Sequence, residues 1–235
     1  MPPIPSLDQA QNYAVTKPLE AEGIRQSLYD FQLYALAGIA QMQFFQQAQG
    51  QGITSSLGAV VGSAKQVQDT NMTQGGSLPN PQHYLMESVE VQFEPGSSAA
   101  ASTFLLATAS SFAAAAAAAI AGQANDVNII RASGSGQLFI SSKTYLWEAP
   151  IGRFPPKTRL EMDCAMATNS ATVGEVALVN AKLGGRPYYL EPPLFITPVQ
   201  NFTFNLVWPG VVATPSGFNG RIGAILDGYL YRASQ

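Results

Sequence analysis

Side chains that commonly carry catalysis or bind metals are scarce in this chain. It has one histidine, His83, and one cysteine, Cys164. A zinc site needs several Cys and His ligands at characteristic spacing, and a Ser-His or Cys-His catalytic pair would have to use His83. His83 lies in a loop-like context after Pro81, which is typical of a surface or hinge histidine. We therefore predict no catalytic, metal-binding or cofactor-binding residues and no enzymatic activity.

Carboxylate pairs occur twice, but their spacing is not specific. Two such groups could hydrolyse a glycosidic bond. Glu161 and Asp163 lie on one face of a predicted strand, and Glu90 and Glu94 lie on one face of another. This spacing is common on solvated sheet faces. The glycines at 134–136 do not predict a phosphate loop, because a third glycine and a following helix are missing.

Basic and aromatic side chains suggest two weak binding sites. Arg153, Lys157 and Arg159 surround a Pro-Pro pair, where they could contact an acidic neighbour or lipid headgroups. The only interleaved aromatic residue is Phe154, which makes the cluster a poor candidate for nucleic acid. A second group could stack on sugars; its members are Tyr188, Tyr189 and Trp208. Trp208 lies on the apolar face of its strand, which favours a place in the core.

Charge is sparse throughout the chain. Only 11% of the 235 residues are charged, against about 25% in an average soluble domain. A thinly charged monomer tends to associate, so we expect partners to cover much of the surface. Residues 31–64 and 95–125 carry no charge, yet the first is interrupted by Gln and Gly and the second is mostly Ala and Ser, so we predict neither as a membrane span.

The first 82 residues predict an arm, a helix and a linker. Four prolines make residues 1–18 an extended arm. Apolar residues at a spacing of three to four then predict an amphipathic helix from Leu19 to about Gln49, with glutamines on its polar face. This helix packs on its own domain or against a neighbouring subunit or membrane surface. Residues 50–82, rich in Gly, Ser, Thr, Asn and Gln, predict an irregular linker.

Residues 83–235 predict a β-sandwich. Alternating patterns between Pro/Gly turns indicate strands. An Ala-rich insert at about 97–124 predicts a helix over 111–121 that ends at Gly122. About eight strands favour a single antiparallel jelly roll. The predicted strands are His83–Glu94, Asn128–Ala132, Gln137–Ser141, Thr144–Glu148, Arg159–Met166, Glu175–Leu183, Tyr188–Glu191, Leu194–Thr197, Asn201–Trp208 and Arg221–Arg232.

The chain has a predicted N-terminal arm and helix, a Gly/Asn/Pro-rich lead-in at Asp69–Pro81 and a series of predicted strands after it. In this order of segments it resembles a capsid protein of non-tailed icosahedral bacterial or archaeal viruses. This resemblance implies upright jelly rolls that form trimers or pseudo-hexameric capsomers, with N-terminal segments beneath the shell and often near an internal membrane. The chain has room for one jelly roll and not two. A single-jelly-roll major or minor capsid protein, or a vertex protein, is therefore expected.

We accordingly predict a structural virion protein that is made in the host cytoplasm and self-assembles into an icosahedral capsid. Its expected partners are identical subunits, other virion proteins and a possible internal membrane, without sequence-specific nucleic acid. A phage receptor-binding or carbohydrate-binding β-sandwich is the alternative. A stable monomer that binds sugar would favour the alternative, whereas large particles or trimers would favour assembly.

Overall fold

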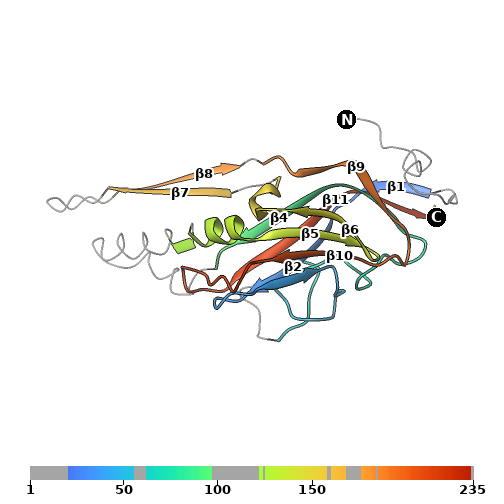
Figure 1. Ribbon diagram of the computed structural model, residues 1–235, viewed down its shortest axis with the longest axis horizontal. Coiled ribbons are helices and arrows are strands. Elements are labelled where there is room, and N and C mark those ends of the chain that lie inside the picture. The colour runs from blue at the N-terminus through green and yellow to red at the C-terminus, as the bar shows by residue number, and fades with distance from the viewer. Residues whose placement is uncertain are drawn as a thin grey trace.

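The computed structural model is mainly β. It describes residues 21–55, 62–96, 122–123, 125–157, 160–167, 176–183 and 185–233, with the backbone alone for residues 160–167 and 176–183. Two antiparallel sheets of five and four strands pack as a sandwich, and a separate two-stranded hairpin completes the β structure (Figure 1). The predicted mainly-β sandwich is confirmed.

The larger sheet is organised around its C-terminal strand. Its order is β1-β11-β4-β9, and β2 also pairs with β11. On one side of β11, β2 pairs with residues 220–226 and β1 with residues 229–233, while β4 runs along the other side. The strands of this sheet are β1 (Ala21–Arg25), β2 (Leu28–Tyr34), β4 (His83–Glu94), β9 (Tyr188–Ile196) and β11 (Gly220–Ala233).

The smaller sheet has the order β3-β10-β5-β6. Every neighbouring pair is antiparallel. The inward side chains of β10 are Phe204 and Leu206, which are fully buried, and alternate residues face outward. The strands of this sheet are β3 (Gln41–Phe44), β5 (Ser135–Ile140), β6 (Lys143–Glu148) and β10 (Phe202–Val207).

Strand pairing across the two sheets is nested. The strand β2 pairs with β11, β3 with β10, β4 with β9 and β5 with β6. The hairpin of β7 (Leu160–Ala167) and β8 (Val176–Leu183) interrupts this series between β6 and β9. Its two strands pair only with one another, and the hairpin extends beyond one end of the sandwich (Figure 1).

One apolar core lies between the sheets and contains side chains of both. Tyr34 and Trp208 meet edge to face with ring centroids 5.4 Å apart, and Phe154 meets Phe204 in the same way at 5.7 Å. The indole N–H of Trp208 donates to the backbone oxygen of Ile130 at 3.1 Å. Aromatic rings therefore fill the space that the two sheets enclose, and the buried indole keeps its hydrogen bond.

The predicted amphipathic helix at 19–49 is wrong, because this segment contains β1, β2 and β3. In β3, Met42 and Phe44 are buried while Gln41 and Gln43 are exposed, which is the period of two of a strand. Because glutamines separate the apolar residues of this segment, the apolar residues also recur every three to four positions, as they would on one face of a helix. Pairing with β10 and β11, more than 150 residues away, selects the strands.

Residues 128–132, predicted as a strand, belong to a helix at 125–133. Residues 122 and 123 are helical as well, so the prediction that Gly122 ends the helix is wrong. The residues 111–121, predicted as the helix itself, and the arm at 1–18 lie outside the described residues. Ile130 is fully buried beneath Trp208, so a tertiary contact and not an alternating pattern explains the apolar residues here.

The two strands predicted at 188–191 and 194–197 are the single strand β9. A Pro-Pro pair lies within it, and β9 tolerates this pair because it is an edge strand that pairs only with β4 in the described sheet. The other predicted strands after residue 83 are confirmed within a few residues. In the predicted linker, residues 50–55 and 62–82 contain one isolated bridge, between Asp30 and Thr70.

A substitution in β3 tests the revised N-terminal structure. Phe44→Ala should lower the free energy of unfolding by about 3–5 kcal/mol, because it empties a fully buried site. Urea unfolding followed by circular dichroism measures the change. The matched control Gln41→Ala, at an exposed position of the same strand, should change stability by less than about 0.5 kcal/mol. Equal effects of the two substitutions would contradict the strand.

Candidate functional site

The main cluster of charged side chains surrounds Asp227 on β11, opposite a bulge in β4. The register between β11 and β4 shifts at this position, which leaves Glu87 as the extra residue of β4. The carboxylate of Asp227 accepts hydrogen bonds from Arg25 Nη2 and Ser27 Oγ, both at 2.7 Å, and from Lys157 Nζ. Arg25 also lies 3.4 Å from Glu87. The cluster thus ties three strands and the segment after β6 together.

The partners of Asp227 favour its charged form. Burial raises the pKa of Asp227, but hydrogen bonds from Lys157, Ser27 and Arg25 outweigh burial and hold the pKa below its ordinary value. A general acid or base needs a pKa near the working pH and access to a substrate proton. Asp227 is 4% exposed and has all its partners within the chain, so it serves to link strands.

Buried polar groups also hold the segment between β3 and β4. Lys65 Nζ pairs with Asp30, and both side chains are buried; the second oxygen of Asp30 accepts from the backbone N–H of Phe45 at 2.7 Å. Burial raises the pKa of Asp30, and Lys65 opposes this shift. Asp69 accepts from Thr54 Oγ1 at 2.7 Å. These bonds explain how an irregular segment is anchored to the sandwich.

His83 and Cys164 do not form a site in the described structure. His83 is the first residue of β4, and its ring stacks on Phe195 with centroids 5.5 Å apart. Burial lowers the pKa of His83, and its Nδ1 has no hydrogen-bond partner among the described residues. Cys164 pairs with Val179 in the hairpin register, and its side chain lies outside the described part.

Of the two carboxylate pairs in the sequence, the structure describes the side chains of Glu90 and Glu94, and both have partners within the chain. Glu90 is buried and accepts from the backbone N–H of Lys157 at 2.9 Å, while Glu94 pairs with Arg221 at 3.0 Å. The side chains of Glu161 and Asp163 lie outside the described part of the hairpin. Within the described residues, no group of three His, Cys, Asp or Glu side chains could hold a metal ion.

The predicted basic cluster is used within the chain where it is described. Arg153 pairs with Glu148 at 2.6 Å and lies over the ring of Tyr188, 5.9 Å from its centroid. Lys157 pairs with Asp227 and Glu90. Arg159 lies outside the described residues. An acidic neighbour or a lipid headgroup would therefore have to displace these internal partners of Arg153 and Lys157.

The glycines at 134–136 are packing residues. A Cβ on Gly134 would lie 2.4 Å from Ile151 Cδ1 and 2.6 Å from Trp208 Nε1. A Cβ on Gly136 would lie 2.6 Å from Phe154 and 2.9 Å from Phe204. The sequence Gly-Ser-Gly therefore allows β5 to pass beneath aromatic rings and does not form a ligand loop.

The three predicted sugar-stacking residues do not form one surface. Trp208 is buried in the core, as its strand pattern indicated. Tyr188 is half-buried and donates to Glu148 at 3.1 Å, whereas Tyr189 is exposed beside Arg186. The most exposed aromatic residue of the described chain is Trp147, at 72%. The alternation of Tyr145 and Trp147 around buried Leu146 was the sequence signal for it.

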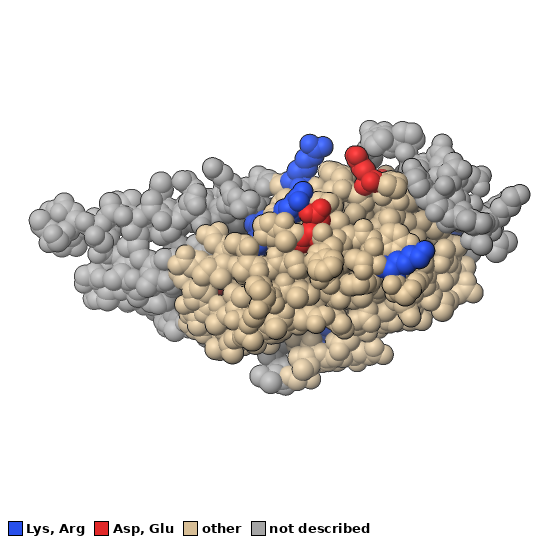
Figure 2. Space-filling view, viewed as in Figure 1, with Lys and Arg blue, Asp and Glu red and all other residues tan. Residues whose placement is uncertain are grey.

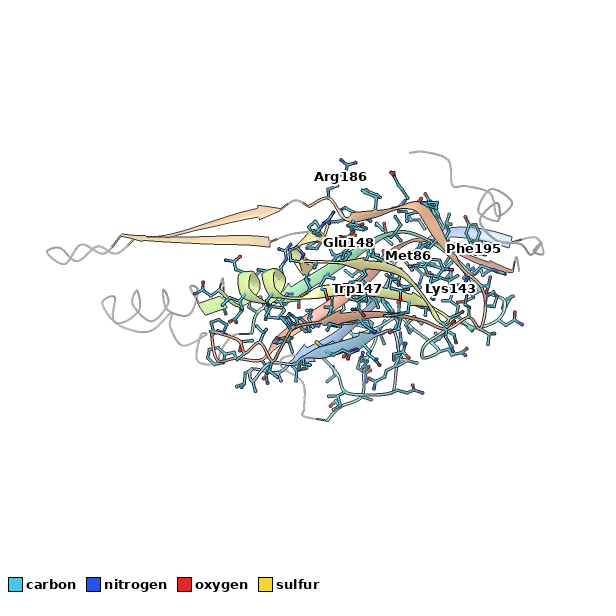
Figure 3. The ribbon with its side chains drawn as sticks, viewed as in Figure 1. Met86, Lys143, Trp147, Glu148, Arg186 and Phe195 are labelled. Atoms are coloured by element: carbon cyan, nitrogen blue, oxygen red, sulfur yellow. The ribbon has the colours of Figure 1, made fainter. Side chains whose placement is uncertain are left out.

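Trp147 ends a row of amide side chains that crosses the outer face of the smaller sheet. In the register, Gln43 on β3 is opposite Asn205 on β10, Asn205 is opposite Gln137 on β5, and Gln137 is opposite Trp147 on β6. We call these four residues the amide row. Figure 3 labels Trp147 and Glu148 on β6, and Figure 2 shows a molecular face on which uncharged side chains predominate.

A groove adjoins the amide row at β3. Its volume is about 480 Å³, within the range of ligand pockets. The groove and the row share Gln43, so they form one continuous uncharged surface. The groove is lined by Gln32, Leu33, Ile39, Gln41, Met42, Gln43, Gln46 and Gln47. This surface, which the amide row and the groove make together, is the candidate binding site.

Comparison of the chain with known protein families, curated proteins and solved structures found no match. Among the described residues, no helix has the length and apolar character needed to cross a membrane.

Removing the carboxylate at the bulge should weaken the fold in a pH-dependent way. Asp227→Asn should lower the free energy of unfolding at about pH 7 by about 1.5–3 kcal/mol, because hydrogen bonds to a charged group are lost. A carboxyl whose pKa is lower in the folded than in the unfolded protein stabilises the fold at pH values above its ordinary pKa of 3.8. This contribution is lost as the pH falls through the pKa of the folded state. Urea unfolding at about pH 7 and pH 3 measures the free energy of unfolding. This free energy should fall less between the two pH values in the variant than in the parent.

The control for this experiment is Glu191→Gln, at an exposed position on β9. It should leave both stability and its acid dependence unchanged. An Asp227→Asn protein with the pH dependence of the parent would contradict the role assigned to the cluster.

Adding a methyl group beneath the aromatic rings should also destabilise the fold. Gly136→Ala should cost about 1–3 kcal/mol, because the new Cβ overlaps Phe154 and Phe204. Gly210→Ala is the matched control, since nothing lies within 4 Å of its added Cβ. Thermal unfolding of the two variants measures the difference, and similar melting temperatures would refute the packing role.

Proposed function

We propose that this chain is a structural virion protein that self-assembles into an icosahedral capsid shell, as a major or minor capsid protein. Its partners would be identical subunits and other virion proteins, and its place would be the virion. It would act by assembling and not by catalysing. A possible internal membrane beneath the shell belongs to the same proposal, and sequence-specific nucleic-acid binding does not.

The nested strand pairing supports a jelly roll as the fold behind this proposal. When β1 and the β7–β8 hairpin are set aside, eight strands remain. The first pairs with the last, the second with the seventh, the third with the sixth and the fourth with the fifth. This is the pairing of one long antiparallel ribbon rolled into two sheets, the arrangement found in viral capsid and lectin jelly rolls.

The observation that carries the assembly proposal is a hairpin that pairs with no other described strand, which we call the unsupported hairpin. The strands β7 and β8 contain eight residues each and pair with no other described strand. An isolated two-stranded hairpin is marginally stable in water. A neighbouring subunit would supply the surface that the hairpin lacks.

The base of the hairpin is closely packed. A Cβ on Gly185 would lie 1.9 Å from the backbone oxygen of Pro156. The two ends of the hairpin therefore leave the sandwich side by side. This geometry lets the hairpin be removed, or contacted by a neighbour, without separating the strands of the main sheets.

Apolar side chains are exposed at the end of the sandwich where the helix lies. Leu36, Val211 and Phe218 are exposed on two loops, and these loops are joined by the hydrogen bond from Thr214 N to the oxygen of Leu36 at 3.0 Å. The helix and the hairpin lie toward the same end (Figure 1). Exposed apolar side chains at the end of the sandwich toward which the hairpin also extends suit a contact between subunits.

Ion pairing within the chain supports the same function. The basic side chains of Arg25, Lys65, Arg153, Lys157, Arg221 and Arg232 pair with acidic groups of the same chain. Few charges then remain to keep subunits apart or to require desolvation in a contact.

Replacement of residues 158–184 by two glycines tests this proposal. The sandwich should still fold, because the hairpin pairs only with itself and its ends lie close together. Assembly should fail, because the proposed contact between subunits is removed. Circular dichroism and thermal unfolding report the fold, while sedimentation velocity and electron microscopy report particles.

The matched control is Val67→Ser, an exposed residue on the opposite, linker side of the chain. It should leave the particles intact. A full chain that stays monomeric at high concentration, or a hairpin-deleted chain that still forms particles, would contradict the proposal.

A further inference from the structure

Two of the three amides of the amide row, those of Gln43 and Gln137, are available for hydrogen bonding. The side chains of Gln43 and Gln137 make no hydrogen bond to any other described residue. Asn205, between them, is mostly buried and its Oδ1 accepts only from Thr203 Oγ1 at 3.0 Å. Each primary amide offers two donors and one acceptor oxygen. The row therefore presents neutral donors and acceptors at the regular spacing of neighbouring strands.

Trp147 adds an exposed apolar plane at the end of the row. Its side chain is 72% exposed, although an indole normally gains free energy from burial. Tyr145, in the bulge of the same strand, is 47% exposed. Flat aromatic faces beside amides complement a pyranose ring, which has an apolar C–H face and a rim of hydroxyl groups.

Charges lie at the margins of this surface. Glu148 follows Trp147 but pairs with Arg153 and accepts from Tyr188. Lys143 lies at the other end of β6 (Figure 3). The amide row and the adjoining groove contain no ionisable side chain. A phosphate, a nucleic acid or an acidic polymer would find no matching cation there, so the complementary ligand is neutral.

The size of the sheet face also favours a small ligand over a second copy of the chain. Three strands of six residues and one of four, about 4.8 Å apart and rising about 3.4 Å per residue, cover about 360 Å². A standard protein interface buries about 800 Å² on each partner. The sheet face supplies about half of that area, whereas the groove of about 480 Å³ at its side is large enough for a small ligand.

We infer that the amide row and the glutamine-lined groove bind a neutral oligosaccharide, with Trp147 stacking on one sugar ring and Gln43 and Gln137 bonding its hydroxyl groups. This activity goes beyond assembly and does not depend on it. A shell protein with such a face would attach to a neutral surface glycan.

Binding is tested on the full chain with a panel of defined probes. Neutral hexasaccharides of β-glucan, xylan and chitin are compared with the acidic hexamer of polygalacturonate. Calorimetry measures affinity, and acrylamide quenching of tryptophan fluorescence reports the site, because Trp147 is exposed and Trp208 is 2% exposed. At least one neutral probe should bind and shield Trp147 from acrylamide, and the acidic probe should not.

Substitutions assign the site. Trp147→Ala should weaken binding by about tenfold, because a stacked aromatic contributes up to about 1.5 kcal/mol and each 1.4 kcal/mol is tenfold. Gln137→Ala should weaken binding severalfold. Tyr189→Ala is the matched control, an exposed aromatic residue on the other sheet, and should bind like the parent. All three positions are at the surface, and thermal unfolding checks that each variant folds.

Three results would overturn the inference. These are the absence of binding to every neutral probe at millimolar concentration, equal losses from Trp147→Ala and Tyr189→Ala, and a loss of particles in Trp147→Ala without any sugar binding, which would make the face a contact between copies. Sugar binding by a chain that forms no particles would support this inference and contradict the proposed assembly, so the two proposals fail separately.

Discussion

The long strand β11 is the element on which the rest of the sandwich depends. It pairs with β1 and β2 along one side and with β4 along the other, and it is buried along almost its whole length. Since β11 is the last strand, the larger sheet is incomplete until the C-terminal end of the chain is in place. The first two described strands, β1 and β2, then pair with β11, and this pairing completes the nested series of strand pairs.

Hydrogen bonds to Asp227, beside the bulge, help to hold β11 in the larger sheet. One carboxylate at the centre of β11 accepts bonds from Arg25, Ser27 and Lys157, which come from the N-terminal strands and from the segment before the hairpin. Because these groups bind one another, the cations at this site are neutralised within the chain although Arg25 and Lys157 are partly exposed. Low net charge at this site is thus a consequence of internal pairing as well as of composition.

The scarcity of charge connects the two proposals. Neutral surfaces suit contacts between subunits, which the unsupported hairpin and the exposed apolar loops would make. A neutral surface lined with amides and ending in an exposed indole suits a polyhydroxyl ligand instead. The two surfaces lie on different parts of the chain, so a shell protein could use one for assembly and the other for attachment.

Much of the fold after residue 83 follows from the sequence alone. Alternation in segments such as 201–208 predicted strands. The alternation of apolar and polar residues along 83–94 is interrupted at Glu87, which is the extra residue in the bulge of β4. The core position of Trp208 also followed from its strand pattern. Such signals are local, because side chains on a strand alternate between faces whatever the partner strand is.

Only the tertiary structure decided which residues come together. The helical spacing at 19–49 and the strand spacing at 128–132 were local patterns that distant partners overruled: β10 and β11 for the first, Trp208 for the second. The amide row was invisible in the sequence, because its members come from four strands between residues 43 and 205. The composition determined that the surface is nearly uncharged; the pairing register, a property of distant segments, decided where its amides and its indole meet.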